Sequence, residues 1–264
     1  MINNQSALKT ALITGASSGI GLEFANLLAK DGYHVVLTAR NEKRLNEIAN
    51  GLRAKHGIEV TIFSKDLSLA DAAEELTAEI LAKGIEIDIL INNAGFAAYG
   101  PFDETSWKDE KDMLQVNITA LTTLTKQLLP GMIKRNRGKI LNVASTAAFQ
   151  PGPLMAVYYA TKAYVLSFSE AIDYELRHTN VSVTALCPGA TATNFEKRAS
   201  LESSRLFQSG TMNAQDVALS GYNALMKEKA VEVPGFKNKA LANIVRFLPR
   251  KTVLKVVHYV QDKK

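Results

Sequence analysis

Short apolar runs rich in β-branched residues alternate along the chain with longer segments in which apolar residues recur at helical spacing. The runs that predict strands are Thr10–Thr14, His34–Ala39, Val60–Ser64, Ile87–Asn92, Lys139–Ala144 and Val181–Leu186. The segments that predict helices are Gly19–Asp31, Lys43–His56, Ala70–Lys83, Lys111–Lys134 and Ala156–His178. Such alternation favours a parallel sheet, because parallel neighbours need a long crossover connection.

We therefore expect an α/β fold, a single-domain Rossmann-type doubly wound parallel sheet with helices on both faces. The predicted strands lack polar–apolar alternation, as is typical of strands covered on both faces. No internal repeat or Pro/Gly/Ser-rich linker divides the 264 residues. We assign residues 1–236 to this domain, with a short last strand after Ala230, and residues 237–264 to a C-terminal extension.

The net charge of +5 is concentrated in that extension. It holds eight Lys or Arg and one acidic residue, which leaves 23 basic against 25 acidic residues in the rest of the chain. The main body is therefore not basic, and we expect no nucleic-acid partner. A polar N-terminus, a single cysteine (Cys187) and the lack of an apolar run approaching the roughly 18 residues of a membrane span favour a cytoplasmic location.

A glycine-rich segment, Thr14–Gly21, follows the first predicted strand and opens the first predicted helix. Its glycines have the spacing G-x-x-x-G-x-G rather than the more widespread G-x-G-x-x-G. Glycine permits a tight turn and close approach of the backbone to a pyrophosphate, whose charge the N-terminus of a helix stabilises. The alternative is an ordinary Gly/Ser loop between a strand and a helix.

Arg40 ends the second predicted strand, about twenty residues after the glycines. NAD sites often place an acid there to hold the adenosine ribose, whereas NADP sites use a cation for the 2′-phosphate. A charge-assisted hydrogen bond of that kind contributes on the order of 1.5–3 kcal/mol. Arg40 therefore predicts NADP as the cofactor, and the alternative is a solvated surface arginine.

Three separated segments carry candidate catalytic side chains. Tyr158 and Lys162 lie one helical turn apart on the same face. Ser145 ends a predicted strand, at the sheet edge where ligand crevices form, and Asn117 lies in a predicted helix. Taken singly these have ordinary explanations, such as an exposed helical pair or a helix N-cap at Ser145.

Together with the glycine loop, these residues resemble the short-chain dehydrogenase/reductase family from about Ala7 to Val233. The motifs that carry the resemblance are Thr14–Gly21, Asp66-Leu67, Asn92-Asn93-Ala94-Gly95, Asn117, Ser145, Tyr158 with Lys162, and Pro188-Gly189. It implies an NADP-dependent oxidoreductase that interconverts a carbonyl and an alcohol by hydride transfer and forms a homodimer or homotetramer. No metal is expected, and the four histidines form no ligand-like cluster.

The resemblance implies that Tyr158 is the general acid toward the carbonyl oxygen, or the base in the reverse direction. Lys162 would hold the nicotinamide ribose hydroxyls and lower the pKa of Tyr158. A cation ~5 Å away at an effective dielectric of ~20 supplies roughly 3.3 kcal/mol, close to the ~3.4 kcal/mol that brings a tyrosine from 10 to about 7.5. Ser145 would hydrogen-bond the substrate oxygen, and Asn117 would support a water-linked proton relay through Lys162.

The resemblance also implies a set of cofactor contacts. Asp66 would place the adenine, Asn92 would line the cofactor channel and Thr191 would contact the carboxamide. The full set is Gly15, Ser17, Ser18, Gly19, Ile20, Gly21, Arg40, Asp66, Leu67, Asn92, Ala94, Gly95, Tyr158, Lys162, Pro188, Gly189 and Thr191.

Segments expected near the nicotinamide are mostly apolar, which favours a small lipophilic carbonyl or alcohol as substrate. These residues are Phe96, Ala97, Ala98, Tyr99, Ala147, Ala148, Phe149, Leu154 and Met155. The loop Ala190–Asn213 is expected to close over the substrate. A reductase of 3-oxoacyl groups on a carrier is the alternative, and a non-catalytic NADP-binding scaffold is disfavoured because all four candidate catalytic residues are present.

In the extension, basic residues are interspersed among apolar ones, so amphipathic helices are predicted on either side of Pro249. Three roles stay open for them. They could attach reversibly to an anionic membrane surface, pack on a neighbouring subunit, or pack on their own domain with a solvated basic face.

Overall fold

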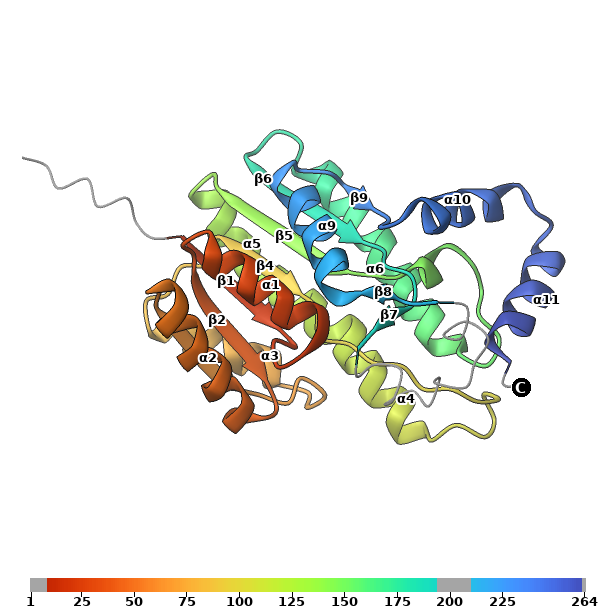
Figure 1. The fold of residues 1–264 in the computed structure, drawn as a ribbon, viewed down its shortest axis with the longest axis horizontal. Helices are drawn as coiled ribbons and strands as arrows, with labels where there is room; N and C mark the ends of the chain where they lie inside the picture. Colours follow the sequence, from red (N-terminus) through yellow and green to blue (C-terminus); the bar gives the residue numbers. More distant parts are fainter. Residues whose placement is uncertain (1–8, 194–209, 263–264) are drawn as a thin grey trace, which may run out of the picture.

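The computed structural model describes residues 9–193 and 210–262, and a seven-stranded parallel sheet forms its centre (Figure 1). The strands lie in the order β3-β2-β1-β4-β5-β6-β9. Their bounds are β1 Thr10–Thr14, β2 His34–Ala39, β3 Val60–Ser64, β4 Ile89–Asn92, β5 Gly138–Val143, β6 Val181–Leu186 and β9 Val231–Glu232. The order reverses between β1 and β4, so a ligand crevice is expected outside the carboxyl ends of these two strands.

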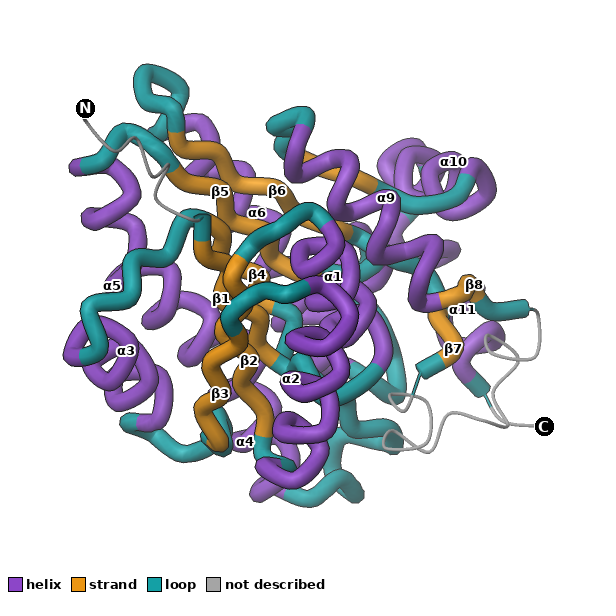
Figure 2. Tube along the Cα trace, turned by 60° about the vertical axis from the view of Figure 1, so that its left-hand side comes forward, coloured by secondary structure: helices purple, strands orange, loops and turns teal. Residues whose placement is uncertain are grey.

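Helices cover both faces of the sheet (Figure 1, Figure 2). The helices α1 (Gly19–Lys30), α2 (Glu42–His56) and α9 (Ala214–Met226) share one hydrophobic core. On the opposite face, α3 (Ala72–Ala82) and α5 (Leu121–Lys134) share a second core with the end of α6 (Ala156–Glu175). The shorter elements are α4 Trp107–Leu114, a π-helical turn η1 Gln115–Ala120, a 3₁₀ turn η2 Thr146–Phe149, and the paired strands β7 Thr191–Ala192 and β8 Met212–Asn213.

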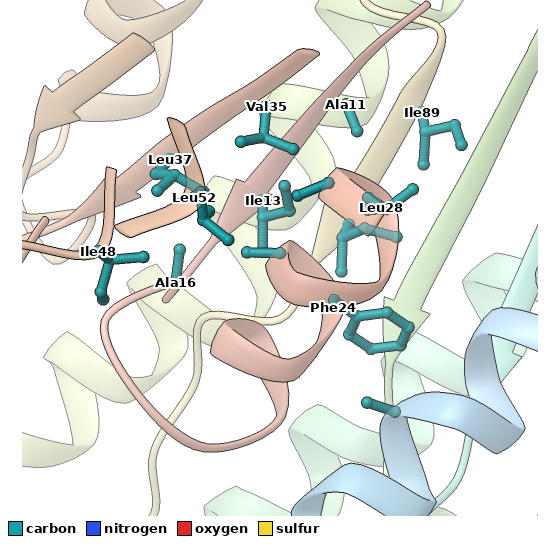
Figure 3. Close-up of a cluster of buried hydrophobic side chains, with 14 of the residues drawn as sticks. Ala11, Ile13, Ala16, Phe24, Leu28, Val35, Leu37, Ile48, Leu52 and Ile89 are labelled. Atoms are coloured by element: carbon teal, nitrogen blue, oxygen red, sulfur yellow. The ribbon is translucent and has the colours of Figure 1, made fainter. Parts of the chain in front are cut away.

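Strand β1 is buried on both of its faces. Ala11 and Ile13 belong to the core beneath α1 and α2, whereas Leu12 between them belongs to the opposite core, and all three are fully buried. Figure 3 shows Ile13 in the first core together with Phe24 and Leu28 of α1. Burial of a side chain of this size contributes about 1.5–3 kcal/mol, so an unbroken apolar run is what a strand in this position requires.

The predicted doubly wound parallel sheet is confirmed, and β1, β2, β3 and β6 have the predicted bounds. The sequence analysis did not predict α9, whose buried residues are Val217, Ala218, Gly221, Ala224 and Leu225. A Cβ on Gly221 would lie 2.7 Å from Leu186 and 2.9 Å from the Phe24 ring, so α9 approaches both β6 and α1 through this glycine.

The extension forms helices on either side of Pro249, as predicted. Its elements are α10 Phe236–Ile244, a 3₁₀ turn η3 Val245–Phe247 and α11 Arg250–Gln261. Figure 1 shows them at the right-hand side of the molecule, following β9. Within the described ranges, no helix combines the length and the apolar character needed to cross a bilayer.

Candidate active site

A cleft of about 1000 Å³ lies at the carboxyl ends of the strands, where the reversal of strand order predicts one. Its wall includes the residue that follows each of four strands: Gly15 after β1, Arg40 after β2, Asn93 after β4 and Ala144 after β5. Pro188, which is separated from the end of β6 by Cys187, also lines it. The extension forms a further wall. We refer to this space as the cleft.

The glycine loop closes one end of the cleft and depends on glycine for its shape. Gly15 and Gly19 have φ values of +65° and +55°, in the left-handed region that L side chains rarely adopt. A Cβ on Gly21 would lie 2.4 Å from Asn93 Nδ2 and 2.5 Å from the Gly15 carbonyl oxygen. Asn93 Nδ2 donates to the Thr14 carbonyl at 2.9 Å, which ties the loop to the end of β4.

The N-terminus of α1 faces the cleft through this loop. Ser17, Ser18, Gly19 and Ile20 line the cleft, and the side chain of the N-cap Ser18 makes no capping hydrogen bond to the helix. The first backbone N–H groups of α1 thus keep their hydrogen-bonding capacity, and the helix dipole favours an anion there. The loop and helix therefore fit the pyrophosphate of a dinucleotide.

Two cations lie at the edge of the cleft beyond β2 and β3. Lys65 is held by Glu75 and Glu79, with Nζ–O distances of 2.7 and 2.8 Å. Arg40 is exposed, and its guanidinium forms no ion pair within residues 9–193 and 210–262. The Arg40 guanidinium is therefore available to bind an anionic ligand, whereas the Lys65 ammonium is paired with two carboxylates.

Tyr158, Ser145 and Lys162 meet in the middle of the cleft. Tyr158 and Lys162 lie on α6, and Lys162 Nζ is 5.8 Å from the centre of the Tyr158 ring. Ser145 follows β5 and hydrogen-bonds the Tyr158 side chain. The same Ser145 Oγ accepts from the Ala147 N–H at 3.1 Å, so this residue is also the N-cap of η2.

Burial dominates the ionisation of this group. It raises the pKa of Tyr158 to about 12, although the hydrogen bond with Ser145 acts in the opposite direction. It also lowers the pKa of Lys162 to about 8, because the ammonium is removed from water. The Lys162 ammonium donates to the Val143 carbonyl at 2.7 Å. In this structure the effect of burial on Tyr158 exceeds that of the Ser145 hydrogen bond, and the expected lowering of the Tyr158 pKa by Lys162 stays a prediction.

Asn117 lies behind this cluster in the π-helical turn η1. Its Nδ2 donates to the Phe96 carbonyl at 3.0 Å and to Thr161 Oγ1 at 3.1 Å, and its Oδ1 accepts from the Phe96 N–H at 3.2 Å. A Cβ on Gly95 would lie 3.1 Å from Asn117 Oδ1 and 3.5 Å from Lys162 Nζ. Asn117 and Lys162 thus flank the Gly95 backbone, and π-helical turns of this kind are frequent at functional sites.

Comparison with known proteins identifies this arrangement. Residues 9–203 match the short chain dehydrogenase family. The chain belongs to the short-chain dehydrogenase/reductase family. It is a family of oxidoreductases that bind a nicotinamide cofactor.

Relatives and solved structures agree with that assignment. Very-long-chain 3-oxoacyl-CoA reductases of Laccaria bicolor and Mus musculus are 38% and 34% identical over 67% and 71% of this chain. The chain spans only 53% and 61% of their lengths. A short-chain dehydrogenase of Sphingobium yanoikuyae in complex with NADPH is 32% identical, with a TM-score of 0.82 over 91% of this chain and 94% of that one. One from Burkholderia phymatum in complex with NAD is 27% identical, with a TM-score of 0.81 over 97% of this chain and 98% of that one.

Most residues predicted for the site of this short-chain dehydrogenase/reductase do line the cleft. They are Gly15, Ser17, Ser18, Gly19, Ile20, Arg40, Asp66, Leu67, Ala94, Gly95, Ser145, Tyr158, Lys162, Pro188, Gly189 and Thr191. Gly21 and Asn117 lie behind the wall instead, where Gly21 permits close packing and Asn117 binds the Phe96 backbone. Of the apolar residues expected near the nicotinamide, Phe96, Ala147 and Met155 line the cleft.

The structure does not support the expected position of Asn92 along the cofactor channel. Asn92 is the last residue of β4 and is buried inside the sheet, where its Nδ2 donates to Asn142 at 2.9 Å and to Thr125 at 3.1 Å. Asn93, the next residue, lines the cleft in its place. Successive side chains of a strand point to opposite faces, so a difference of one position decides which asparagine reaches a ligand.

The extension supplies the cleft residues that the sequence analysis missed. They are Asn238, Leu241, Ala242, Val245, Val256, Val257, Val260 and Gln261. Ala242 and Val253 are buried, so α10 and α11 pack on their own domain as one of the three alternatives proposed. The predicted closing loop, Ala190–Asn213, lies outside the described residues from 194 to 209. The helical spacing of the apolar residues in the extension predicted α10 and α11, but it did not predict that these helices form a wall of the cleft.

Proposed function

We propose that this short-chain dehydrogenase/reductase is an NADP-dependent enzyme that interconverts a carbonyl and an alcohol. The observation that carries the proposal is the buried group of Tyr158, Ser145 and Lys162, which opens on the same cleft as a dinucleotide-binding glycine loop. The loop, the N-terminus of α1 and Lys162 would hold the cofactor. When bound in its reduced form, the nicotinamide supplies the hydride that the carbonyl carbon accepts.

The side chains of the cleft then manage the carbonyl oxygen and its proton. With a pKa of about 12, Tyr158 is protonated at neutral pH and is ready to donate to the oxygen as negative charge develops on it. Ser145 orients that oxygen beside the Tyr158 hydroxyl through its own hydroxyl. Lys162 keeps a positive charge in the buried site below pH 8 and favours the phenolate that remains on Tyr158 after proton transfer. Asn117 fixes the backbone of Phe96 beside this group.

We favour NADP over NAD as the cofactor. The support is Arg40, which lines the cleft at the end of β2 and forms no ion pair within the described ranges, as a 2′-phosphate site requires. The relative from Sphingobium yanoikuyae was crystallised with NADPH, and the one from Burkholderia phymatum with NAD. The charge at Arg40 is therefore the feature on which the preference for NADP rests.

The proposed substrate is a small lipophilic carbonyl or alcohol. Support comes from the apolar residues around the cluster, which include Phe96, Met155 and the three valines of α11 at positions 256, 257 and 260. A similar structure, 28% identical, belongs to a bulky-bulky ketone specific alcohol dehydrogenase from Comamonas testosteroni. The second candidate substrate is a 3-oxoacyl thioester, which the names of the very-long-chain 3-oxoacyl-CoA reductases favour.

The proposed setting is the cytoplasm, with the chain assembled as a homodimer or homotetramer and reversibly attached to anionic membranes through its extension. The membrane contact is supported by the outer surface of α10 and α11. In the described part of the chain, eight of the 16 exposed large hydrophobic side chains lie between Phe236 and Tyr259, and six of them, all except Leu241 and Val256, lie outside the lining of the cleft. Arg246, Arg250 and Lys251 are exposed among them, and apolar groups beside basic ones are what an anionic lipid surface binds.

NADPH oxidation measured against ketones, aldehydes, quinones and 3-oxoacyl thioesters tests the function. Turnover of at least one class is expected, and Tyr158→Phe is expected to lower kcat at least 10²-fold while leaving the Kd for NADPH within about threefold, because the hydroxyl is the proton donor. Turnover that survives in Tyr158→Phe with every active carbonyl would contradict the assigned role. Tyr164→Phe, on the exposed side of the same helix, is the matched control and is expected to retain activity.

A further inference from the structure

The last turn of α11 carries a buried glutamine in the wall of the cleft. Gln261 is 1% exposed and lines the cleft together with Tyr158 and Tyr159. Its Nε2 donates to the Tyr159 hydroxyl, and its backbone carbonyl accepts from the Tyr99 hydroxyl at 3.1 Å. Two tyrosines of the main domain thus hold Gln261 in place, one through its side chain and the other through its backbone.

One atom of this side chain lacks a partner. Gln261 Oε1 is buried and accepts no hydrogen bond from any residue of the described ranges. Buried polar atoms in folded proteins are nearly always paired, so each exception needs an explanation. Seven such side-chain atoms occur in the described ranges, and only those of Thr38 and Gln261 belong to residues that line the cleft. Thr38 lies on β2 two residues before Arg40, whereas Gln261 lies beside the catalytic group.

The other residues of α11 that line the cleft are apolar. They are Val256, Val257 and Val260. Met155, in the segment just before α6, also lines the cleft. A ligand in this part of the cleft meets one fixed amide group among aliphatic side chains. Such a wall binds a largely apolar molecule and selects it by a single polar group.

We propose that Gln261 is a specificity-determining residue that accepts a hydrogen bond from a hydroxyl group of the substrate. This inference rests on the proposed carbonyl–alcohol chemistry and narrows its substrate class to lipophilic ketones that carry a second, hydroxylated position. A hydroxyl group both donates and accepts hydrogen bonds. It would therefore also pair with Gln261 Nε2 if the oxygen and nitrogen of the Gln261 amide exchanged places. The Tyr158 and Tyr159 ring centres are 6.1 Å apart, so the hydroxyl belongs several bonds away from the carbonyl.

The chemistry explains why selection at this position is effective. A site with a buried hydrogen-bonding group rejects an analogue that lacks the matching group, because the buried atom is then left unpaired. A plain hydrocarbon at the same position would leave Gln261 Oε1 without a partner, whereas a hydroxyl would pair it. The hydrogen bond of a neutral pair corresponds to about a 2- to 13-fold preference.

The test uses bicyclic aromatic ketones that carry a hydroxyl, a methoxy or a methyl group at one ring position at a time. Their Kd values are measured by calorimetry with full-length protein saturated with oxidised cofactor, and KM and kcat are measured separately with NADPH. For at least one position, wild type is expected to bind the hydroxyl compound about 2- to 13-fold more tightly than the methyl compound. Gln261→Leu and Gln261→Met are expected to remove that preference and to leave the Kd of the methyl compound within about twofold.

Val257→Ala is the matched control, since it alters the same wall of the cleft without removing a polar group. It is expected to weaken all three compounds alike. Thermal unfolding of each variant identifies a loss of the α11 contact, which would weaken all ligands equally. A hydroxyl preference that persists in both Gln261 variants, or a change confined to cofactor affinity, would overturn the assignment of Gln261 while leaving the proposed reaction intact. Failure of every carbonyl to bind or react would remove the proposed reaction and this inference with it.

Discussion

The buried charge of Lys162 predicts an unusual effect of pH on stability. Burial lowers the pKa of this lysine from 10.5 to about 8, which corresponds to roughly 3 kcal/mol against the charged form. Between pH 8 and 10.5 the unfolded chain therefore binds more protons at this residue than the folded chain. Stability consequently rises with pH across that window, and the full penalty is present below it.

Replacing Lys162 with Met isolates this contribution. The substitution removes roughly 3 kcal/mol of penalty at pH 7 but only about 1 kcal/mol at pH 10, by the same linkage relation. It also leaves the Val143 carbonyl without the 2.7 Å hydrogen bond, which costs about 1–3 kcal/mol at every pH. We expect the variant to be as stable as wild type or up to ~2 kcal/mol more stable at pH 7. That difference is expected to fall by about 2 kcal/mol at pH 10.

Urea unfolding without cofactor at pH 7, 8, 9 and 10 measures the two free energies of unfolding. Lys126→Met on α5 is the control, because Lys126 is exposed and its replacement is expected to give a difference independent of pH. A difference between Lys162→Met and wild type that stays constant from pH 7 to 10 would refute the buried charge. A difference that increases with pH would reverse the sign of the proposed pKa change.

Three further predictions concern the rim of the cleft and the extension. Arg40→Ala is expected to weaken NADPH binding about 10- to 100-fold and NADH binding little, by fluorescence titration of both cofactors; equal effects would make Arg40 a surface residue only. Gly21→Ala places a Cβ 2.4 Å from Asn93 Nδ2, so it is expected to lower the Tm, whereas Gly51→Ala, with no atom within 4 Å, is not. Arg250→Glu is expected to reduce flotation with anionic vesicles at low salt and leave neutral vesicles unaffected; unchanged flotation would contradict the membrane contact.

Periodicity predicted the sheet well because buried parallel strands leave an unbroken apolar run in the sequence. It did not predict α9, in which the buried residues recur at helical spacing but three of the five, Ala218, Gly221 and Ala224, are small. Helices α10 and α11 were predicted from the spacing of their apolar residues. Their position over the cleft depends on contacts between distant segments of the chain. Gln261 has a neighbouring tyrosine 102 positions away in the sequence, and no local pattern announces such a pair.

The candidate site was predictable where a motif fixes the backbone, and less so where burial decides the chemistry. The glycine loop and the Tyr158–Lys162 spacing each constrain the backbone, so the structure brings them together in the cleft. The choice between Asn92 and Asn93 depends on where β4 ends, to within one residue. The directions of the pKa changes depend on the depth of burial, which the spacing of residues along a helix does not contain.

The pKa values of Tyr158 and Lys162 also predict that the two directions of the reaction respond oppositely to pH. Reduction needs a protonated Tyr158 and a charged Lys162; the first persists to about pH 12, and the second is lost above about pH 8. The kcat/KM for carbonyl reduction is therefore expected to be level up to pH 8 and to fall above it. Oxidation needs the phenolate, whose formation at pH 7 costs on the order of 7 kcal/mol from a pKa of about 12. The positive charge of an oxidised nicotinamide would offset part of that cost. Alcohol oxidation is thus expected to rise by up to tenfold per pH unit between pH 6 and 8. Initial rates in both directions with one carbonyl–alcohol pair measure both profiles, and matching profiles would show that Tyr158 and Lys162 do not control the proton.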